Sequence, residues 1–170
     1  MIRALYERAG ELHGHLCPGL ATGVRAAYEA RRLLGIETPG RGLYCIAESR
    51  ACYIDGIQAV FGATLGNGNI EIRPRGKAAF NFYDRDTGRS VRLISIADTA
   101  GMTREAAIDY ILTAPFEAVL AQTAARLAPP DAAAPPRRAR GRCSRCGEEC
   151  DQAYFAIVGG ALVCPDCAQV

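Results

Sequence analysis

The chain has 170 residues, of which 49% are hydrophobic, and a formal net charge of +2 at pH 7. This length predicts one domain with a small appendage, and the charge is too small to indicate a polyanionic partner. No apolar run approaches the roughly 20 residues that span a bilayer, and the N-terminal residues lack the apolar segment of a signal peptide. We therefore expect a cytoplasmic protein with no membrane segment.

The apolar pattern predicts helices over residues 1–12, 18–34 and 52–61, with a short strand at 43–48 before the third helix. Three more strands are expected at 69–74, 76–84 and 89–97. Residues 103–127 are expected to be helical with a break at Pro115, because the residue before a proline avoids helical angles. Few strands with helices before and after them predict an α+β core, with a small, mostly antiparallel sheet flanked by helices.

The composition changes once, at residues 128–142, which are rich in proline, alanine and arginine and show no apolar periodicity. Such a stretch is typical of an extended linker. We therefore expect a core over residues 1–128, a linker over 129–141 and a small cysteine-rich domain over 142–170.

The C-terminal cysteines have the spacing of a zinc finger. Two C-x2-C pairs, Cys143 with Cys146 and Cys164 with Cys167, are separated by 17 residues. Each pair points two thiolates at one position, and four thiolates complete a tetrahedral zinc shell. Gly159-Gly160 predicts a hairpin turn between the pairs. We expect a structural zinc finger of treble-clef or ribbon type, with zinc supplying its folding free energy.

Cys150 is the spare cysteine of this region, and it could replace Cys146 as a ligand, although the symmetric choice is better. A basic run lies beside the finger. It consists of Arg137, Arg138, Arg140, Arg142 and Arg145. The run could contact a phosphate backbone, but we favour a solvated linker because the alanine and proline content already explains the segment.

The stretch HGHLCPG at residues 13–19 holds both histidines of the chain and a cysteine. Pro18 suits the first position of a helix, which places Cys17 at the N-cap, where the helix dipole favours a negatively charged sulfur. In an extended segment His13, His15 and Cys17 would share one side. Three such ligands leave a fourth position for a distant residue or for water. We favour a functional site over packing at a helix start.

The best distant candidates are Cys52 and Asp55, which with Gln58 or Ala59 line one face of the expected helix at 52–61. For Cys52 alone, the alternative of a small buried apolar residue is favoured. For Asp55, the alternative is a solvated helix residue. Cys45 lies in an expected strand and is interpreted as a core residue.

Four segments together resemble the FmdE-like family, which is named after the FmdE protein of formylmethanofuran dehydrogenase. They are HGHLCPGLATGVRAA, CYIDGIQAVFGATLGNGNI, GKAAFNFYDRDTG, and the pair CSRCGEE and CPDCA. The resemblance implies an α+β core that forms a homodimer, a C-terminal zinc finger, and a cleft around His15, Cys17, Cys52 and Asp55, where zinc or another divalent metal binds. It also implies a link to the oxidoreductase activity of molybdenum or tungsten formylmethanofuran dehydrogenase in one-carbon metabolism, with a molybdopterin enzyme as partner.

The chain departs from the family pattern at one position. The family often has Gly-Cys-Thr after the glutamine helix, where this chain has Gly62, Ala63 and Thr64. A redox role that needs this cysteine is in doubt, whereas a single-metal site that uses Cys17 and Cys52 is not.

Two hypotheses of different classes follow. In the first, a metal in the core is held by His15, Cys17 and Cys52, with His13 in reserve and Asp55 orienting a ligand or acting as a base; the small-molecule ligand is unknown. In the second, the protein is a non-catalytic regulator that binds a partner protein or nucleic acid through the finger and its arginine run.

Overall fold

A computed structural model describes residues 1–40, 42–129 and 139–169. The chain divides into two compact units, Met1–Pro130 and Asp131–Val170. The predicted linker at 129–141 lies mostly outside the described residues, and so do Arg137 and Arg138 of the basic run. Within the described ranges, no helix is both long and apolar enough to cross a membrane.

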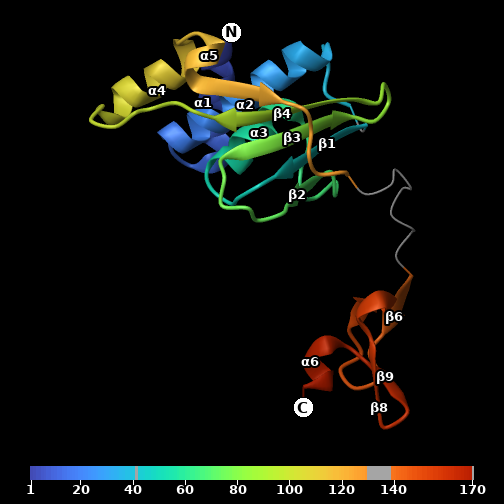
Figure 1. Cartoon of the computed structure of the whole chain (residues 1–170). Coiled ribbons are helices and arrows are strands. Elements are labelled where there is room, and N and C mark those ends of the chain that lie inside the picture. The colour runs from blue at the N-terminus through green and yellow to red at the C-terminus, as the bar shows by residue number, and fades with distance from the viewer. Residues whose placement is uncertain (41, 130–138, 170) are drawn as a thin grey trace. The chain divides into compact units, whose positions relative to one another are not determined.

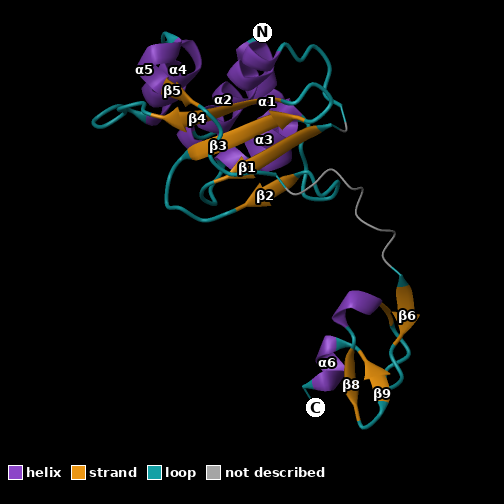
Figure 2. Ribbon diagram, turned by 45° about the vertical axis from the view of Figure 1, so that its right-hand side comes forward, coloured by secondary structure: helices purple, strands orange, loops and turns teal. Residues whose placement is uncertain are grey.

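The first unit combines helices with one five-stranded sheet (Figure 1, Figure 2). Its helices are α1 (Ile2–His13), α2 (Pro18–Leu34), α3 (Tyr53–Phe61), α4 (Arg104–Thr113) and α5 (Phe116–Val119). Its strands are β1 (Leu43–Ala47), β2 (Ile70–Ile72), β3 (Ala79–Asp84), β4 (Arg89–Ser95) and β5 (Leu120–Thr123). The strand order is β2-β1-β3-β4-β5, and only the β1–β2 pair is parallel. The predicted α+β class with a small, mostly antiparallel sheet is confirmed.

The prediction of helix over 103–127 is wrong at its C-terminal end. The break before Pro115 is present, because Ala114 has an extended ψ of 157°. After the short α5, however, the chain becomes strand β5 and pairs antiparallel with β4, opposing Leu120 to Ser95 and Ala121 to Ile94. The pairing satisfies backbone groups of β4 that would otherwise be unpaired, a long-range gain that overrides local helix propensity.

The helices pack against only one face of the sheet (Figure 2). Alternate residues of β1 and β3 point to this face, including Cys45, Phe80 and Phe82, and all three are fully buried with the helices in the main apolar cluster. The prediction that helices flank the sheet is therefore correct for one face only. The segment after β5, not a helix, covers part of the other face, where Ala125 and Leu127 pack on a smaller apolar cluster.

That second face also buries an ion pair. Glu48 accepts hydrogen bonds from Nε and Nη2 of Arg92, at 2.5 and 2.8 Å, and one from the amide of Asn81 at 3.0 Å. The side chains of Glu48 and Arg92 are 4% and 1% exposed. The hydrogen bonds to Arg92 hold the pKa of Glu48 below its ordinary value, against the opposing effect of burial.

Helices α2 and α3 approach closely through glycines. A Cβ at Gly56 would lie 2.7 Å from the backbone oxygen of Leu20 and from the backbone nitrogen of Val24, and a Cβ at Gly23 would collide with the backbone of Tyr53. Real Cβ atoms do not come so near to backbone, so only glycine permits this crossing. The crossing fixes how the N-terminal ends of α2 and α3 lie relative to one another.

We expect Gly56→Ala to destabilise the first unit by about 1–3 kcal/mol or more, because backbone cannot move aside as a flexible side chain can. Urea unfolding followed by circular dichroism measures the change. Gly66→Ala is the matched control, because a Cβ there meets nothing within 4 Å. Equal stability of the two variants would contradict the close crossing.

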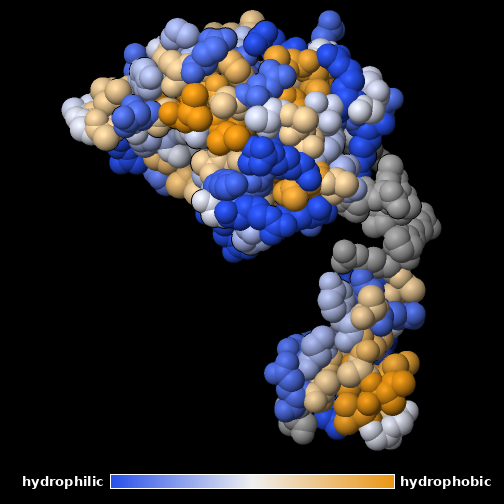
Figure 3. Space-filling model, in the orientation of Figure 1, coloured by the Kyte–Doolittle hydropathy of each residue, from blue (hydrophilic) through white to orange (hydrophobic). Residues whose placement is uncertain are grey.

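The second unit holds two short hairpins and a short helix. Its elements are β6 (Arg140–Arg142), β7 (Glu149–Asp151), the 3-10 helix η1 (Gln152–Tyr154), β8 (Ala156–Val158), β9 (Ala161–Val163) and α6 (Pro165–Ala168). Gly159 and Gly160 both have positive φ and form the β8–β9 turn, as predicted. Among residues 139–169 the buried side chains are few, namely Cys143, Val163 and Cys164. Figure 3 shows an apolar patch at the β8–β9 hairpin, where Ile157 and Leu162 form an exposed cross-strand pair.

Candidate metal centres

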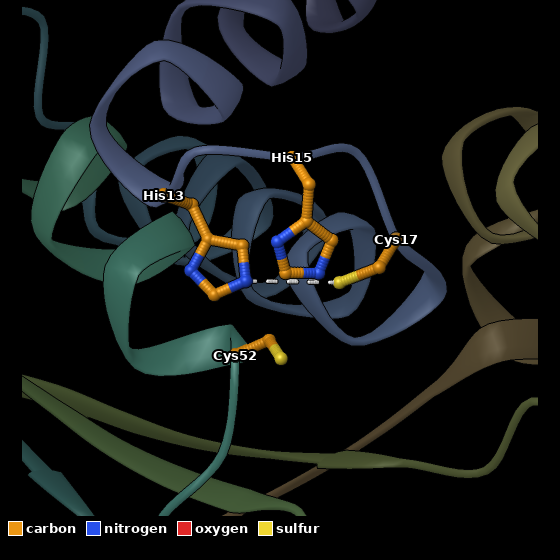
Figure 4. A group of neighbouring side chains, drawn as sticks. All are labelled: His13, His15, Cys17 and Cys52. Atoms are coloured by element: carbon orange, nitrogen blue, oxygen red, sulfur yellow. Dashed lines mark hydrogen bonds between the residues drawn. The ribbon is translucent and has the colours of Figure 1, made fainter.

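The first unit brings His13, His15, Cys17 and Cys52 together. One donor atom from each lies within 4.8 Å of the donor atoms of the other three. The first three side chains come from the end of α1, the connection to α2 and the N-cap of α2, while Cys52 is the N-cap of α3. Figure 4 shows the four side chains directed at a common centre. The two segments meet because α2 and α3 cross at their glycines.

The backbone at His13 differs from the extended array that we predicted. Helix α1 continues through His13 and ends at Gly14, which has a φ of 85°. Only glycine adopts such a value readily, and it reverses the chain so that His15 returns toward His13. The two imidazole rings lie next to each other in a tilted arrangement, with centroids 4.4 Å apart and an interplanar angle of 37°. A helix end and a tight turn, not a strand, therefore bring the donors together.

His13 sits between a carboxylate and a thiol. Its Nδ1 lies 2.6 Å from Oδ2 of Asp55, and its Nε2 lies 3.9 Å from Sγ of Cys17. A carboxylate on one ring nitrogen fixes the tautomer and orientation that present the other nitrogen to a metal. His13 is therefore placed as a ligand, and Asp55 is placed to orient it from behind.

Gln58 extends this arrangement by one residue. Its amide nitrogen donates to Oδ1 of Asp55 at 3.1 Å, and its amide oxygen accepts from the backbone N–H of Leu65 at 3.0 Å. The sequence placed Gln58 beside Asp55 but did not indicate that the pair supports His13. The spacing of three between Asp55 and Gln58 was the available signal for their pairing. The contact of Asp55 with His13, 42 residues away, leaves no such signal in the sequence.

Cys17 is held more firmly than Cys52. Its sulfur is buried and accepts a hydrogen bond from the backbone N–H of Leu20 at 3.3 Å, which is an N-cap interaction of α2. The hydroxyl of Tyr6 donates to the backbone oxygen of Cys17 at 3.2 Å. Cys52 is half-buried, and its side chain makes no cap bond. Both thiols stand at N-terminal ends of helices, where the positive end of the dipole favours negative sulfur.

Burial and Cys17 oppose the ionisation of the Cys52 thiol. Burial raises the pKa of the Cys52 thiol, and the hydrogen bond and charge of Cys17 raise it further. Two negative sulfurs without a cation between them repel. A bound divalent cation removes this repulsion, so the donor set fits a metal. Ala63, where the family often has cysteine, is fully buried in the main apolar cluster and is not among these four donors.

The second unit forms a separate cluster. One donor atom from each of Cys143, Cys146, Cys164 and Cys167 lies within 4.8 Å of the others. Backbone N–H groups of Cys146 and Cys164 lower the pKa of the Cys143 thiol to about 6. Cys150 is outside the cluster, and its sulfur contacts the backbone oxygen of Asp151. The four cysteines predicted as ligands are therefore the four that converge.

The described arginines beside this cluster have partners inside their own unit. Arg140 and Arg142 lie 3.6 and 3.5 Å from the carboxylate of Glu149, and Arg145 donates to the backbone oxygen of Cys167 at 2.6 Å. The pairing with Glu149 offsets part of the positive charge that would attract a phosphate backbone, although both arginine side chains stay exposed.

A family model, a solved structure and a curated protein are similar to this chain. The family model described as "FmdE, Molybdenum formylmethanofuran dehydrogenase operon" matches residues 12–121. A solved structure described as a tungsten formylmethanofuran dehydrogenase FmdE-like protein from Syntrophus aciditrophicus has the same fold. Its TM-score is 0.69 at 22% identity, and the match covers 98% of this chain and 91% of that chain.

A curated relative from Archaeoglobus fulgidus is described as a "Probable S-adenosyl-L-methionine-binding protein". It is 37% identical over 91 residues, which are 51% of this chain and 25% of that protein, so the chain spans about a quarter of its length. The family match covers most of the first unit, including all four donors of its candidate metal centre. The chain belongs to the FmdE family.

Proposed function

We propose that this protein is an FmdE-like metalloprotein with two different centres, one in each unit. The observation that carries the proposal is the convergence of His13, His15, Cys17 and Cys52 within 4.8 Å. The second centre is the four-cysteine cluster. The two centres differ in their donors and in the structure that holds them, so they serve different purposes.

Zinc is the metal that suits the core centre best. Two imidazoles and two thiolates arranged around one point match the tetrahedral nitrogen and sulfur shells that zinc takes in proteins. When bound, zinc would supply Lewis acidity. The residues of this chain would hold the metal: Asp55 orients His13, and the N-terminal ends of α2 and α3 favour negative charge on the two sulfurs.

The finger centre is proposed as structural zinc of treble-clef type. The first cysteine pair lies in the β6–β7 hairpin, the β8–β9 hairpin follows, and the second pair brackets the start of α6. This order is the reason for choosing treble-clef over ribbon. Four thiolates close the shell and leave no position for a substrate.

The family suggests the cellular role. We infer that the protein is a cytoplasmic homodimer that acts beside molybdenum or tungsten formylmethanofuran dehydrogenase in one-carbon metabolism. Gel filtration of the purified chain with and without such a dehydrogenase complex tests this role, and a shared peak with a dimer mass for the free chain is expected. A monomer that elutes separately contradicts it. A nucleic-acid role is not favoured, because Arg140, Arg142 and Arg145 are engaged within the finger.

Metal analysis of the full chain tests the two centres. We expect two metal ions per chain after loading with zinc and removal of the excess. The double variant Cys17→Ser with Cys52→Ser is expected to keep one ion, and Cys143→Ser with Cys164→Ser is expected to keep the other. If the wild-type chain holds one ion and the core double variant still holds it, the core centre does not exist.

Asp55→Asn is expected to weaken the core metal by about 10–100-fold without emptying the finger. The amide loses the negative charge that orients His13, and loss of such an outer partner typically has this effect. Competition with a chromophoric chelator measures the affinity. Asp109→Asn is the matched control, because its carboxylate contacts Arg3 at the surface, and an equal loss in both variants would rule out the orienting role.

A further inference from the structure

The four donors of the core centre are not held equally. Cys17 is buried and fixed by the N–H of Leu20, and the His13 side chain is 11% exposed and fixed by Asp55. Cys52 is half-buried and packs against Gly19. A Cβ added at Gly19 would lie 3.2 Å from the Cβ of Cys52. His15 is exposed. Within the described residues (1–40, 42–129 and 139–169), the side chain of His15 has the tilted ring of His13 beside it and no hydrogen-bond partner.

These differences separate three donors that are at least partly buried from one, His15, that is exposed. Without His15, the set is His13, Cys17 and Cys52. Two cysteines and one histidine form a ligand set that catalytic zinc sites use, with the fourth position left to water or substrate. A closed structural site instead anchors all four ligands. His15 stands on the short connection between α1 and α2, next to the left-handed Gly14, and can turn away without unwinding either helix.

Charge indicates which ligand would replace His15. The thiolates of Cys17 and Cys52 cancel the two charges of a divalent metal, and Asp55 adds negative charge behind His13. The metal with these ligands therefore has no excess positive charge to attract an anion. A neutral donor does not depend on such an attraction. Leu12 and Leu16, which are next to His13 and His15 in the chain, are 61% and 45% exposed, so part of the surface formed by this stretch is apolar.

We propose that His15 is an exchangeable ligand, and that the core metal accepts in its place a small organic molecule presenting a neutral nitrogen or oxygen donor. His15 closes the metal shell when this molecule is absent. The inference rests on the proposed core centre and deepens it, because it assigns the centre to ligand binding and not to structural support.

The test uses the full-length chain loaded with cobalt(II), whose visible absorption reports its ligands. The spectrum of the Cys17→Ser, Cys52→Ser double variant represents the finger alone and is subtracted. His15→Ala is expected to retain one core metal per chain under conditions at which His13→Ala, the matched histidine variant, has lost it. Imidazole is expected to shift the core bands of His15→Ala saturably, and to shift those of the wild type only at higher concentration, because it must displace His15.

Three results would overturn the inference. The first is a His15→Ala chain that loses its core metal as completely as His13→Ala. The second is a core spectrum that imidazole leaves unchanged in both proteins. The third is a shift by acetate at lower concentration than by imidazole, which would reject the neutral donor. If the wild type holds only the finger metal, the proposed core centre itself fails and the inference fails with it; in the first three cases the core centre stands.

Discussion

Cys143→Ser is expected to unfold the second unit while the first unit stays folded. The part of the second unit that the structure describes buries only a few side chains, too few to offset the entropy of ordering the chain without a metal. Metal binding in zinc-finger peptides contributes about 10–16 kcal/mol at neutral pH, so removing one thiolate removes most of the folding free energy. The first unit has its own large apolar cluster and does not depend on this metal.

Hydrogen exchange at single amides measures this result. The amides of Cys143 and Ser144 donate to Glu148 and Leu162 in the folded unit, and their protection should disappear in Cys143→Ser. Cys150→Ser is the matched control, because Cys150 lies outside the cluster. Retained protection in Cys143→Ser would contradict folding that depends on this metal, and equal loss in Cys150→Ser would contradict the assignment of the four ligands.

Glu48→Gln is expected to destabilise the first unit by about 3–5 kcal/mol. The substitution removes the charge that pairs with Arg92 and leaves a guanidinium buried without compensation. Glu71→Gln is the matched control, because Glu71 also accepts hydrogen bonds from an arginine, Arg73, but its side chain is 36% exposed. For such a pair at the surface we expect about 1 kcal/mol or less. Urea unfolding of both variants at pH 7 gives the comparison.

Acid sensitivity provides a second readout for Glu48. Its pKa in the folded protein is lowered, so the unfolded chain binds the proton more tightly. The stability that Glu48 contributes is therefore complete above the unfolded value of about 4.5 and is lost as the pH falls through the lower folded value. Wild type should lose stability in this acid range more steeply than Glu48→Gln. Parallel pH profiles would contradict a role for the ionised carboxylate.

Features that depend on near neighbours in the chain were predictable. The paired C-x2-C motifs indicated the finger ligands, and Gly159-Gly160 indicated its hairpin, because each is a local geometric unit. Pro18 placed Cys17 at the N-cap of α2 for the same reason. The break at Pro115 follows from sterics between adjacent residues.

Features that depend on residues far away in the chain could not be predicted from the sequence. Residues 120–123 carry no local signal against helix, and they form a strand only because the edge of β4 is available. The position of Asp55 behind His13 depends on the packing of α3 against α1 and α2, which the sequence does not state.

The sequence by itself therefore indicated which residues offer candidate metal donors, since thiol and imidazole groups and their spacing are properties of the chain, although for Cys52 alone it favoured a buried apolar residue. The tertiary structure decided how those donors differ. It buried Cys17 at a helix N-terminus, supported His13 with Asp55 and left His15 exposed. The physical reason is that burial and hydrogen bonding arise only when α1, α2 and α3 pack together, and the glycines of α2 and α3 permit that packing.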